Sequence, residues 1–436
     1  MAVLVDRALL RAVILVAAAA LGVCLAAIPV AAQEPPVQAS TDRTDAVRVF
    51  LDCNSCDENY LRTEVTFISY VRDRTAADVH VLVTTEHTGG GGIQYTLKFI
   101  GLGRFKGVDN SLIYSAPQTA TSDARRRGFT EIFKLGLVRY VADSSVSERL
   151  KLTFDAPANQ QKAEAVRDPW NFWVFRVGAG GNLEGQQQSS ERSIEAGFSA
   201  NRTTERWKIN INGDSEYNED KFELEDGDTF TAVSRNSQAR ALAVKSLNER
   251  WSVGGTVLTT SSTFQNYDVR TRIAPGIEYN FFPYSESTRR ILTLVYSVGV
   301  QHANYTEETI FGKTSERLLD HELEMSLALR QPWGSAAASV EAQHYLNRRN
   351  KYRVNAFGEV DVRLFKGFTL EMFVSASRRR DQLSLRRGSA STEEILVRQR
   401  ELATGYQYEV GFGISYSFGS IFNNVVNPRF RNVGGG

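Results

Sequence analysis

Large apolar residues alternate with polar or very small ones over much of the second half of the chain. From Tyr406 to Phe418 every second residue is Tyr, Val, Phe or Ile, and the residues between them are Gln, Glu, Gly or Ser. Alternate side chains of a β-strand point to opposite faces, so this segment predicts a strand with one apolar and one polar face. The same alternation occurs at residues 323–329 and 352–362, where the polar positions include charges.

These segments are long enough to cross a membrane. About nine to eleven tilted residues of a strand span a bilayer, whereas strands of soluble sheets are usually about five or six residues long. Twelve segments fit the pattern: 171–183, 190–202, 204–217, 230–246, 250–263, 269–282, 289–304, 317–331, 334–347, 351–365, 368–383 and 406–418.

The joints between these segments alternate in length. Tight joints at 201–204, 247–249, 332–334 and 365–367 alternate with long charged ones at 217–228, 305–315 and 378–405. Short periplasmic turns and long extracellular loops are typical of outer-membrane barrels. The fold predicted is mainly β: an antiparallel transmembrane β-barrel of about twelve strands over residues 169–419. The resemblance to bacterial outer-membrane barrels is one of architecture, and it implies a location in the cell outer membrane.

Residues 47–142 show mixed periods that predict a small α+β domain. The order is strand, helix, strand, strand and helix, with a hairpin turn at the glycines of residues 89–92 and a closing helix capped by Ser122 or Asp123. The first helix is expected at residues 58–72, and the strands are expected at 47–51, 78–85 and 93–100. This domain is loosely similar to the amino-terminal domain of TolB-type periplasmic proteins, and we expect it in the periplasm.

The first residues have the order of a secretory signal peptide. Arg7 and Arg11 precede an apolar stretch that ends in small residues, which predicts cleavage after Ala32. An uncleaved anchor helix is the alternative, and Val23 before Cys24 argues against a lipoprotein. We expect a signal peptide at 1–32, a disordered segment at 33–46, a linker at 143–168 and a periplasmic tail at 420–436.

Charge and hydropathy exclude other classes of protein. Cleavage removes Asp6, Arg7 and Arg11, so the 51 basic and 50 acidic residues become 49 of each. A formally neutral exported chain gives no reason to expect a nucleic-acid partner. Beyond the signal no run of eighteen apolar residues occurs, which argues against membrane-spanning helices.

The last predicted strand carries Gly413, Tyr416 and Phe418. These residues resemble the glycine and alternate-aromatic signal that the outer-membrane assembly machinery reads on terminal strands, although Gly411 stands where a polar residue is usual. The resemblance implies that this machinery is a partner, with outer-membrane lipid and lipopolysaccharide as surroundings.

Cys53 and Cys56 lie between a predicted strand and a predicted helix. In an oxidising compartment the pair predicts a structural or incidental disulfide, or two unpaired thiols. Thiol–disulfide exchange is the second interpretation, and a metal site with His80 or His87 is a third. No cofactor is expected.

Charged residues on the polar faces of the strands are candidates for lining the lumen. They could form a narrow polar passage, or pair with one another and fill the barrel. The candidates are Arg270, Arg272, Glu278, Arg353, Glu359, Asp361 and Arg363.

Lipolysis is an alternative because His344 falls on the apolar face near a strand end. Leu346, however, stands where such a lipase would place its serine.

Three classes of function remain. We favour a barrel that anchors a periplasmic domain, with a structural or interaction role in the cell envelope and a periplasmic protein as a candidate partner, because a simple porin would not explain that domain. The alternatives are a narrow pore or transporter for small solutes, and an envelope enzyme acting at Cys53 and Cys56 or on lipid. No catalytic set is complete, so the sequence favours a protein that is not an enzyme.

Overall fold

The structure, a computed structural model, describes residues 46–144, 146–149, 168–223, 229–388, 401–422 and 424. The predicted signal peptide lies outside these residues, as do nearly all of segment 33–46 and most of the linker and the tail. Their boundaries therefore stay predictions.

A five-stranded sheet forms the first described part, which we call the α+β region (residues 46–144). Its strands are β1 (Arg48–Asp52), β2 (Ser69–Tyr70), β3 (Val79–His87), β4 (Ile93–Gly101) and β5 (Asn110–Ala116), in the spatial order β2-β1-β3-β4-β5. β1 is parallel to β2 and β3, and the other pairs are antiparallel. The helices are α2 (Glu58–Glu64) and α3 (Ser122–Val141), with short 3-10 turns at Arg74–Ala76, Gly103–Phe105 and Ser147–Arg149. No helix in the described part of the chain is long and apolar enough to span a membrane.

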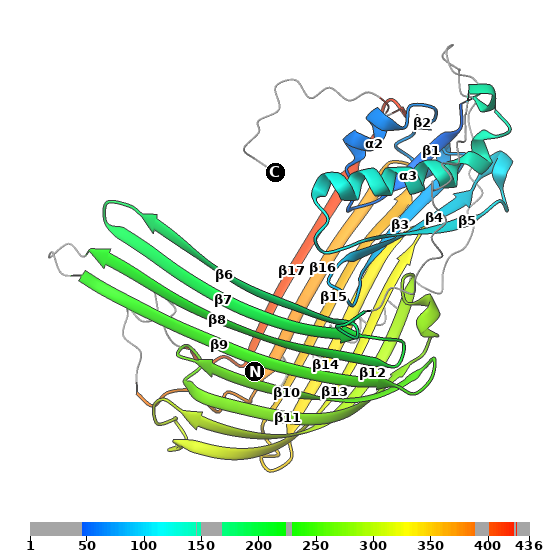
Figure 1. The fold of residues 1–436 in the computed structure, drawn as a ribbon. Coiled ribbons are helices and arrows are strands. Elements are labelled where there is room, and N and C mark those ends of the chain that lie inside the picture. The colour runs from blue at the N-terminus through cyan, green and yellow to red at the C-terminus, as the bar shows by residue number, and fades with distance from the viewer. Residues whose placement is uncertain are drawn as a thin grey trace, which may run out of the picture. The chain divides into compact units, whose positions relative to one another are not determined.

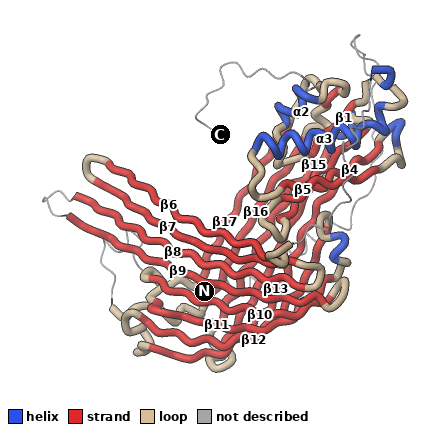
Figure 2. The backbone as a smooth tube through the Cα atoms, in the orientation of Figure 1, coloured by secondary structure: helices blue, strands red, loops and turns tan. Residues whose placement is uncertain are grey.

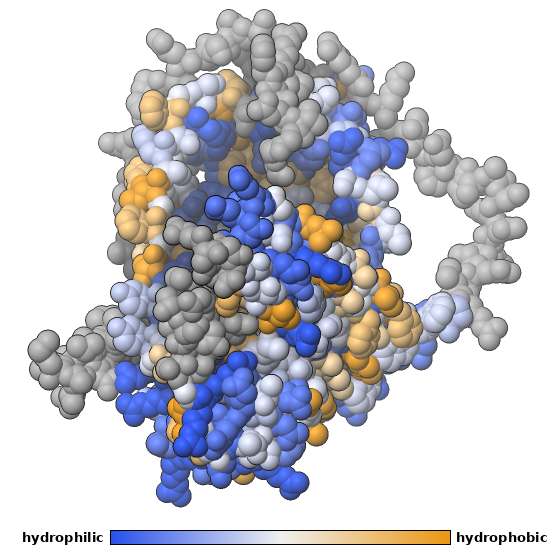
Figure 3. All heavy atoms as spheres, turned by 90° about the vertical axis from the view of Figure 1, so that its left-hand side faces the viewer, coloured by the Kyte–Doolittle hydropathy of each residue, from blue (hydrophilic) through white to orange (hydrophobic). Residues whose placement is uncertain are grey.

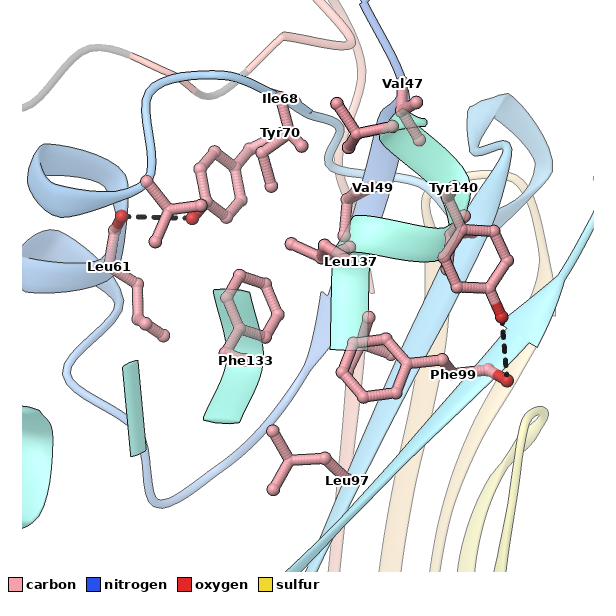
Figure 4. Close-up of a cluster of buried hydrophobic side chains, with 14 of the residues drawn as sticks. Val47, Val49, Leu61, Ile68, Tyr70, Leu97, Phe99, Phe133, Leu137 and Tyr140 are labelled. Atoms are coloured by element: carbon pink, nitrogen blue, oxygen red, sulfur yellow. Dashed lines mark hydrogen bonds between the residues drawn. The ribbon is translucent and has the colours of Figure 1, made fainter. Parts of the chain in front are cut away.

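One face of α3 packs on this sheet and forms its core. Phe133 and Leu137 are fully buried beside Leu97 and Phe99 (Figure 4). Gly136 permits this close approach, because a Cβ atom there would lie 2.0 Å from the Phe99 ring. The fully buried Tyr140 hydroxyl donates to the Val108 carbonyl at 2.7 Å, so the core holds its polar group in a hydrogen bond.

The structure corrects three local predictions in this region. α2 ends at Glu64 rather than at residue 72, because Ser69 pairs with Arg48 of β1 and the chain enters the core as strand β2. β5 was not predicted, since Leu112, Ile113 and Tyr114 are consecutive and break the alternation of apolar and polar residues. The cap of α3 is Thr121, whose hydroxyl accepts from the Ala124 amide at 3.1 Å, one residue before the expected Ser122.

The second described part is a single twelve-stranded antiparallel sheet in which every strand pairs with its neighbours in sequence (Figures 1 and 2). The strands are β6 (Trp173–Gly185), β7 (Ser189–Thr203), β8 (Trp207–Glu223), β9 (Thr229–Ser246), β10 (Trp251–Ser262), β11 (Tyr267–Asn280), β12 (Arg290–Tyr305), β13 (Ser315–Gln331), β14 (Gly334–Tyr345), β15 (Tyr352–Phe365), β16 (Phe368–Arg379) and β17 (Tyr406–Tyr416). The prediction of a mainly β protein with twelve antiparallel strands and a small α+β region is confirmed.

The sheet has two ends with different connections. We call the end with the β7–β8, β9–β10, β13–β14 and β15–β16 joints the turn end, and the opposite end the loop end. The alternation in length is weaker than predicted, because the β6–β7 joint at the loop end is also short and the β11–β12 joint at the turn end contains a 3-10 turn, Tyr284–Glu286. β6 and β17 are the two edges, and among the described strands each pairs with a single neighbour.

The register gives the sheet one apolar and one polar face. Leu323 lies opposite Tyr296 and Ala342, whereas the next position along, Glu322, lies opposite Ser297 and Gln343. Large side chains of the apolar face, such as Val300 and Phe412, are more than half exposed. Figure 3 shows such hydrophobic patches beside hydrophilic ones. Exposed apolar area of this extent marks a surface that contacts something other than water.

Candidate functional site

An ion pair joins the α+β region to the turn end of the sheet. Asp52, the last residue of β1, accepts two hydrogen bonds from Arg363 of β15, with both nitrogen–oxygen distances 2.7 Å. This bidentate arrangement is the strongest geometry available to an arginine and a carboxylate. Arg363 belongs to the polar face of β15, since it lies two residues after Asp361, which pairs with Ser335. The contact therefore reaches the face that the sequence predicts to line the lumen.

His80 fixes the carboxylate of Asp52 from the other side. Its Nε2 lies 3.0 Å from Asp52 Oδ2, and Arg74 Nε donates to its Nδ1 at 3.2 Å. Arginine has no acceptor atom, so Nδ1 must accept and the imidazole proton is assigned to Nε2, which donates to Asp52. His80 is thus neutral. Burial lowers its pKa below the usual value, and the hydrogen bond to Asp52 only partly opposes this.

Asp52 remains charged in this setting. Burial acts to raise its pKa, but the hydrogen bonds from His80 and Arg363 outweigh burial and hold the pKa below the usual value. Phe50 closes the cluster, with the His80 ring centroid 5.1 Å from its own and the Arg363 guanidinium 5.3 Å from its ring. We call Asp52, Arg74, His80 and Arg363 the docking cluster.

Further contacts follow the turn end. Asp73 accepts from the Gly367 amide at 2.7 Å in the β15–β16 turn, where a positive φ of 73° favours glycine. Arg72 donates through its amide to the Ile421 carbonyl and through its side chain to the Phe418 carbonyl. Weaker hydrogen bonds join Ser287 to Glu86 at 3.3 Å and Arg330 to the Thr85 carbonyl at 3.4 Å. The α+β region therefore touches several turn-end connections and the segment that follows β17.

The segment that follows β16 packs against the polar face at the loop end. Leu383 is buried in a cluster with Leu318 of β13 and Tyr345 of β14, both on the polar face. The Ser384 carbonyl accepts from Asn266 Nδ2 at 2.9 Å, and the Leu385 carbonyl accepts from the Ile310 amide at 2.8 Å. We call residues 381–387 the loop-end segment.

The predicted lumen residues fall into two groups. At the loop end, Arg272 pairs with the fully buried Asp320 at 2.6 Å and with Glu322 at 3.3 Å. Arg353 pairs with Asp381 of the loop-end segment, Nη2 to Oδ2 2.6 Å, without regular hydrogen-bond geometry. Arg270 stacks on the Tyr267 ring at 4.8 Å.

The second group lies toward the turn end. Glu278 accepts from the Tyr284 hydroxyl, and Arg363 belongs to the docking cluster. Glu359 and Asp361 lie on the same face of β15 and join none of the ion pairs seen in the described ranges. The structure thus brings the arginines to acids supplied by other segments rather than to these two carboxylates.

Cys53 and Cys56 form a disulfide immediately after β1. Both residues are half-buried, and Cys56 lines an open cleft of about 260 Å³. Leu61, Tyr95 and Phe129 form an apolar floor, and Arg125 and Arg126 lie on the rim. Within the described residues, no three His, Cys, Asp or Glu side chains gather as metal ligands would.

The other predicted residues have simple surroundings. His344 lies on the apolar face, edge-to-face with His321 at 5.5 Å, and its Nε2 is 3.0 Å from the Arg349 carbonyl. Gly413 lies on the polar face of β17. Tyr416 and Phe418 are mostly exposed. His87 ends β3 at the surface.

Sequence reasoning missed the acids that neutralise the lumen arginines. Asp320 could have been found, since it stands in phase with Glu322 and Glu324 on the polar face of β13. Asp52 and Asp381 carry no such signal, because each comes from a segment outside the strand pattern.

Comparison with known proteins gives one family model that matches part of the larger sheet. The family described as "Protein of unknown function, DUF481" matches residues 179–381. No curated protein matches the chain.

Three solved structures illustrate the likeness of fold. The NanC porin is 10% identical over 56% of this chain and 99% of its own, with a TM-score of 0.27. The translocator domain of the autotransporter NalP from Neisseria meningitidis is 12% identical over 56% of this chain and 82% of its own, with a TM-score of 0.18. The β-domain of the Bordetella autotransporter BrkA is 11% identical over 56% and 98%, with a TM-score of 0.24. At such TM-scores these likenesses carry no conclusion about this chain.

Proposed function

We propose that the chain is an outer-membrane barrel, filled by its own segments, that anchors the α+β region in the periplasm for a structural or interaction role. The docking cluster is the observation that supports this proposal most. In it, Asp52 of the α+β region forms a bidentate ion pair with Arg363 on the polar face of the sheet.

The two faces of the sheet support the membrane part of the proposal. Its exposed apolar side chains suit lipid, and its polar face carries charges that pair within the chain. In a membrane, pairing of β6 with β17 would satisfy the backbone groups of both edges, which lipid cannot do. The two strands run in opposite directions, as an antiparallel pair requires.

Both ends of the polar face are occupied, which favours an anchor over a pore. The α+β region contacts the turn end, and the loop-end segment buries Leu383 among polar-face side chains. The turn end then faces the periplasm with the α+β region, and the loop end faces outward toward lipopolysaccharide. We place Gly413 and Tyr416 of β17, with Phe418 just after the strand, within reach of the assembly machinery.

The test uses the mature chain purified in detergent. We expect a heat-modifiable shift on gels, β-rich circular dichroism, and no discrete conductance in planar bilayers where an open porin conducts under the same conditions. Discrete conductance would replace the anchor by the narrow pore or transporter. A soluble chain without a gel shift would overturn the membrane assignment.

A further inference from the structure

The disulfide lies beside a cleft that suits a polypeptide segment. The cleft combines an apolar floor with Arg125, Arg126 and the carboxylate of Asp57, which pairs with Arg126, and Cys56 and Ser55 form part of its wall. A volume of about 260 Å³ admits one or two side chains rather than a large cofactor. An incoming chain could therefore bring an apolar side chain and a neighbouring thiol to Cys56 together.

The disulfide contributes little to holding this part of the fold. A bridge between residues three apart closes a very short loop, and short loops constrain the unfolded chain least. The start of α2 has its own support, since Asp57 accepts from the Tyr60 amide at 3.0 Å and pairs with Arg126 at 3.4 Å. Because the disulfide lines a cleft and stabilises the fold little, it can be reduced and formed again without unfolding this region.

We propose that Cys53 and Cys56 exchange with the thiols of cysteine-bearing polypeptides that dock in this cleft. The thiolate of the polypeptide attacks Cys56 Sγ, a mixed disulfide forms, and Cys53 leaves as a thiolate that takes a proton from water. The second thiolate of the polypeptide attacks the mixed disulfide and releases Cys56. Two electrons pass from the polypeptide dithiol to the chain, which is left with two thiols.

The rim cations assist the second step, in which Cys56, which lines the same cleft, is the leaving thiolate. Cationic surroundings favour the thiolate form of a leaving cysteine. Arg126 already pairs with Asp57 and Asp123, so we assign the recognition of an acidic residue on the polypeptide to Arg125. The preferred segment then has an apolar residue and an acidic residue next to its cysteine. This activity is independent of whether the barrel conducts.

The experiment mixes the oxidised full chain in detergent with a reduced synthetic peptide that carries two cysteines, the first flanked by Phe and Glu. Samples are quenched by alkylation, and the mass of the fragment with Cys53 and Cys56 reports reduction. A peptide with Gly and Lys in place of Phe and Glu, and reduced glutathione, serve as comparisons. We expect the first peptide to react fastest, and Arg125→Glu to slow it roughly fivefold.

Arg127→Glu is the matched control, because Arg127 lies on the same helix outside the cleft and pairs with Asp123. It is expected to leave the rate unchanged. Cys53→Ser should trap the oxidised peptide on Cys56, and Cys56→Ser should trap far less on Cys53. A disulfide that none of the thiols reduces would overturn the proposal. So would equal rates for all three thiols with no effect of Arg125→Glu, which would indicate reaction with small thiols only.

Discussion

Asp52→Asn tests the docking cluster most directly. The asparagine keeps the size of the side chain and one acceptor oxygen, so His80 can still donate to it, but the charge that balances Arg363 is lost. Asp52 and Arg363 make two hydrogen bonds of 2.7 Å, and their side chains are 10% and 33% exposed. The pair is therefore mostly withdrawn from water.

The expected cost follows from that geometry. Removing one partner of a buried ion pair typically costs about 3–5 kcal/mol. Because a third of Arg363 stays hydrated, we reduce this cost to about 2–3 kcal/mol, at and below the lower end of that range. The equilibrium between docked and undocked α+β region should then shift by roughly 30- to 150-fold toward the undocked form.

Hydrogen exchange at the Gly367 amide measures this shift, because that amide donates to Asp73 only when the region is docked. Asp57→Asn is the matched control, since it changes another carboxylate of the region, asparagine caps helices as well as aspartate does, and Asp57 contacts no strand of the larger sheet. Equal protection of Gly367 in the wild type and in Asp52→Asn would refute the assigned role of the ion pair.

Three further predictions concern acid, lipid and the loop end. His80 has a lowered pKa, so its stabilising contribution is present above its unfolded value of about 6.5 and is lost as the pH falls below it. Amide protection in β1 and β3 should therefore decline as the pH falls below about 6.5, and His80→Asn should flatten that decline. Leu323→Arg on the apolar face should lower the unfolding free energy in lipid vesicles by about 2–4 kcal/mol, whereas Glu324→Arg on the polar face of β13 should cost much less; equal costs would contradict the lipid-facing assignment. Asp381→Ala leaves Arg353, whose side chain is 37% exposed, without its carboxylate partner and should lower the temperature at which the gel shift is lost, by an amount equivalent to about 2 kcal/mol; an unchanged temperature would argue against this pair.

The strands were predictable because their pattern is strictly local. Alternation at 323–329 depends only on which face each residue occupies, and the observed β13 contains that segment in the expected phase. The same reasoning failed for residues 58–72, since Leu61, Val65 and Ile68 have helical spacing and enter one core, but only Leu61 lies in α2, and Val65 and Ile68 belong to the connection to β2. Burial alone does not distinguish a helix from a turn followed by a strand.

The docking cluster was not predictable because its partners are far apart in sequence. Asp52 and Arg363 are 311 residues apart, and nothing near either of them indicates the other. Arg363 was correctly placed on the polar face, yet that placement allowed a water-filled passage as well as an ion pair. Asp52, the carboxylate that pairs with Arg363, belongs to the α+β region, and the strand pattern does not extend to that region.

β15 shows how the two ends of the sheet are linked. Arg353 and Arg363 lie on the same face of this strand, and each pairs with an acid from another segment, Asp381 at the loop end and Asp52 at the turn end. Ten residues of strand span roughly 33 Å, and a tilt of about 40° reduces this to roughly 25 Å along the membrane normal, the height of the apolar band of such barrels. The two ion pairs would then stand at the two margins of the membrane. Because each arginine would otherwise remain as a partly buried cation, the loop-end segment and the α+β region stabilise the strand itself, which favours the proposed anchor over an open pore.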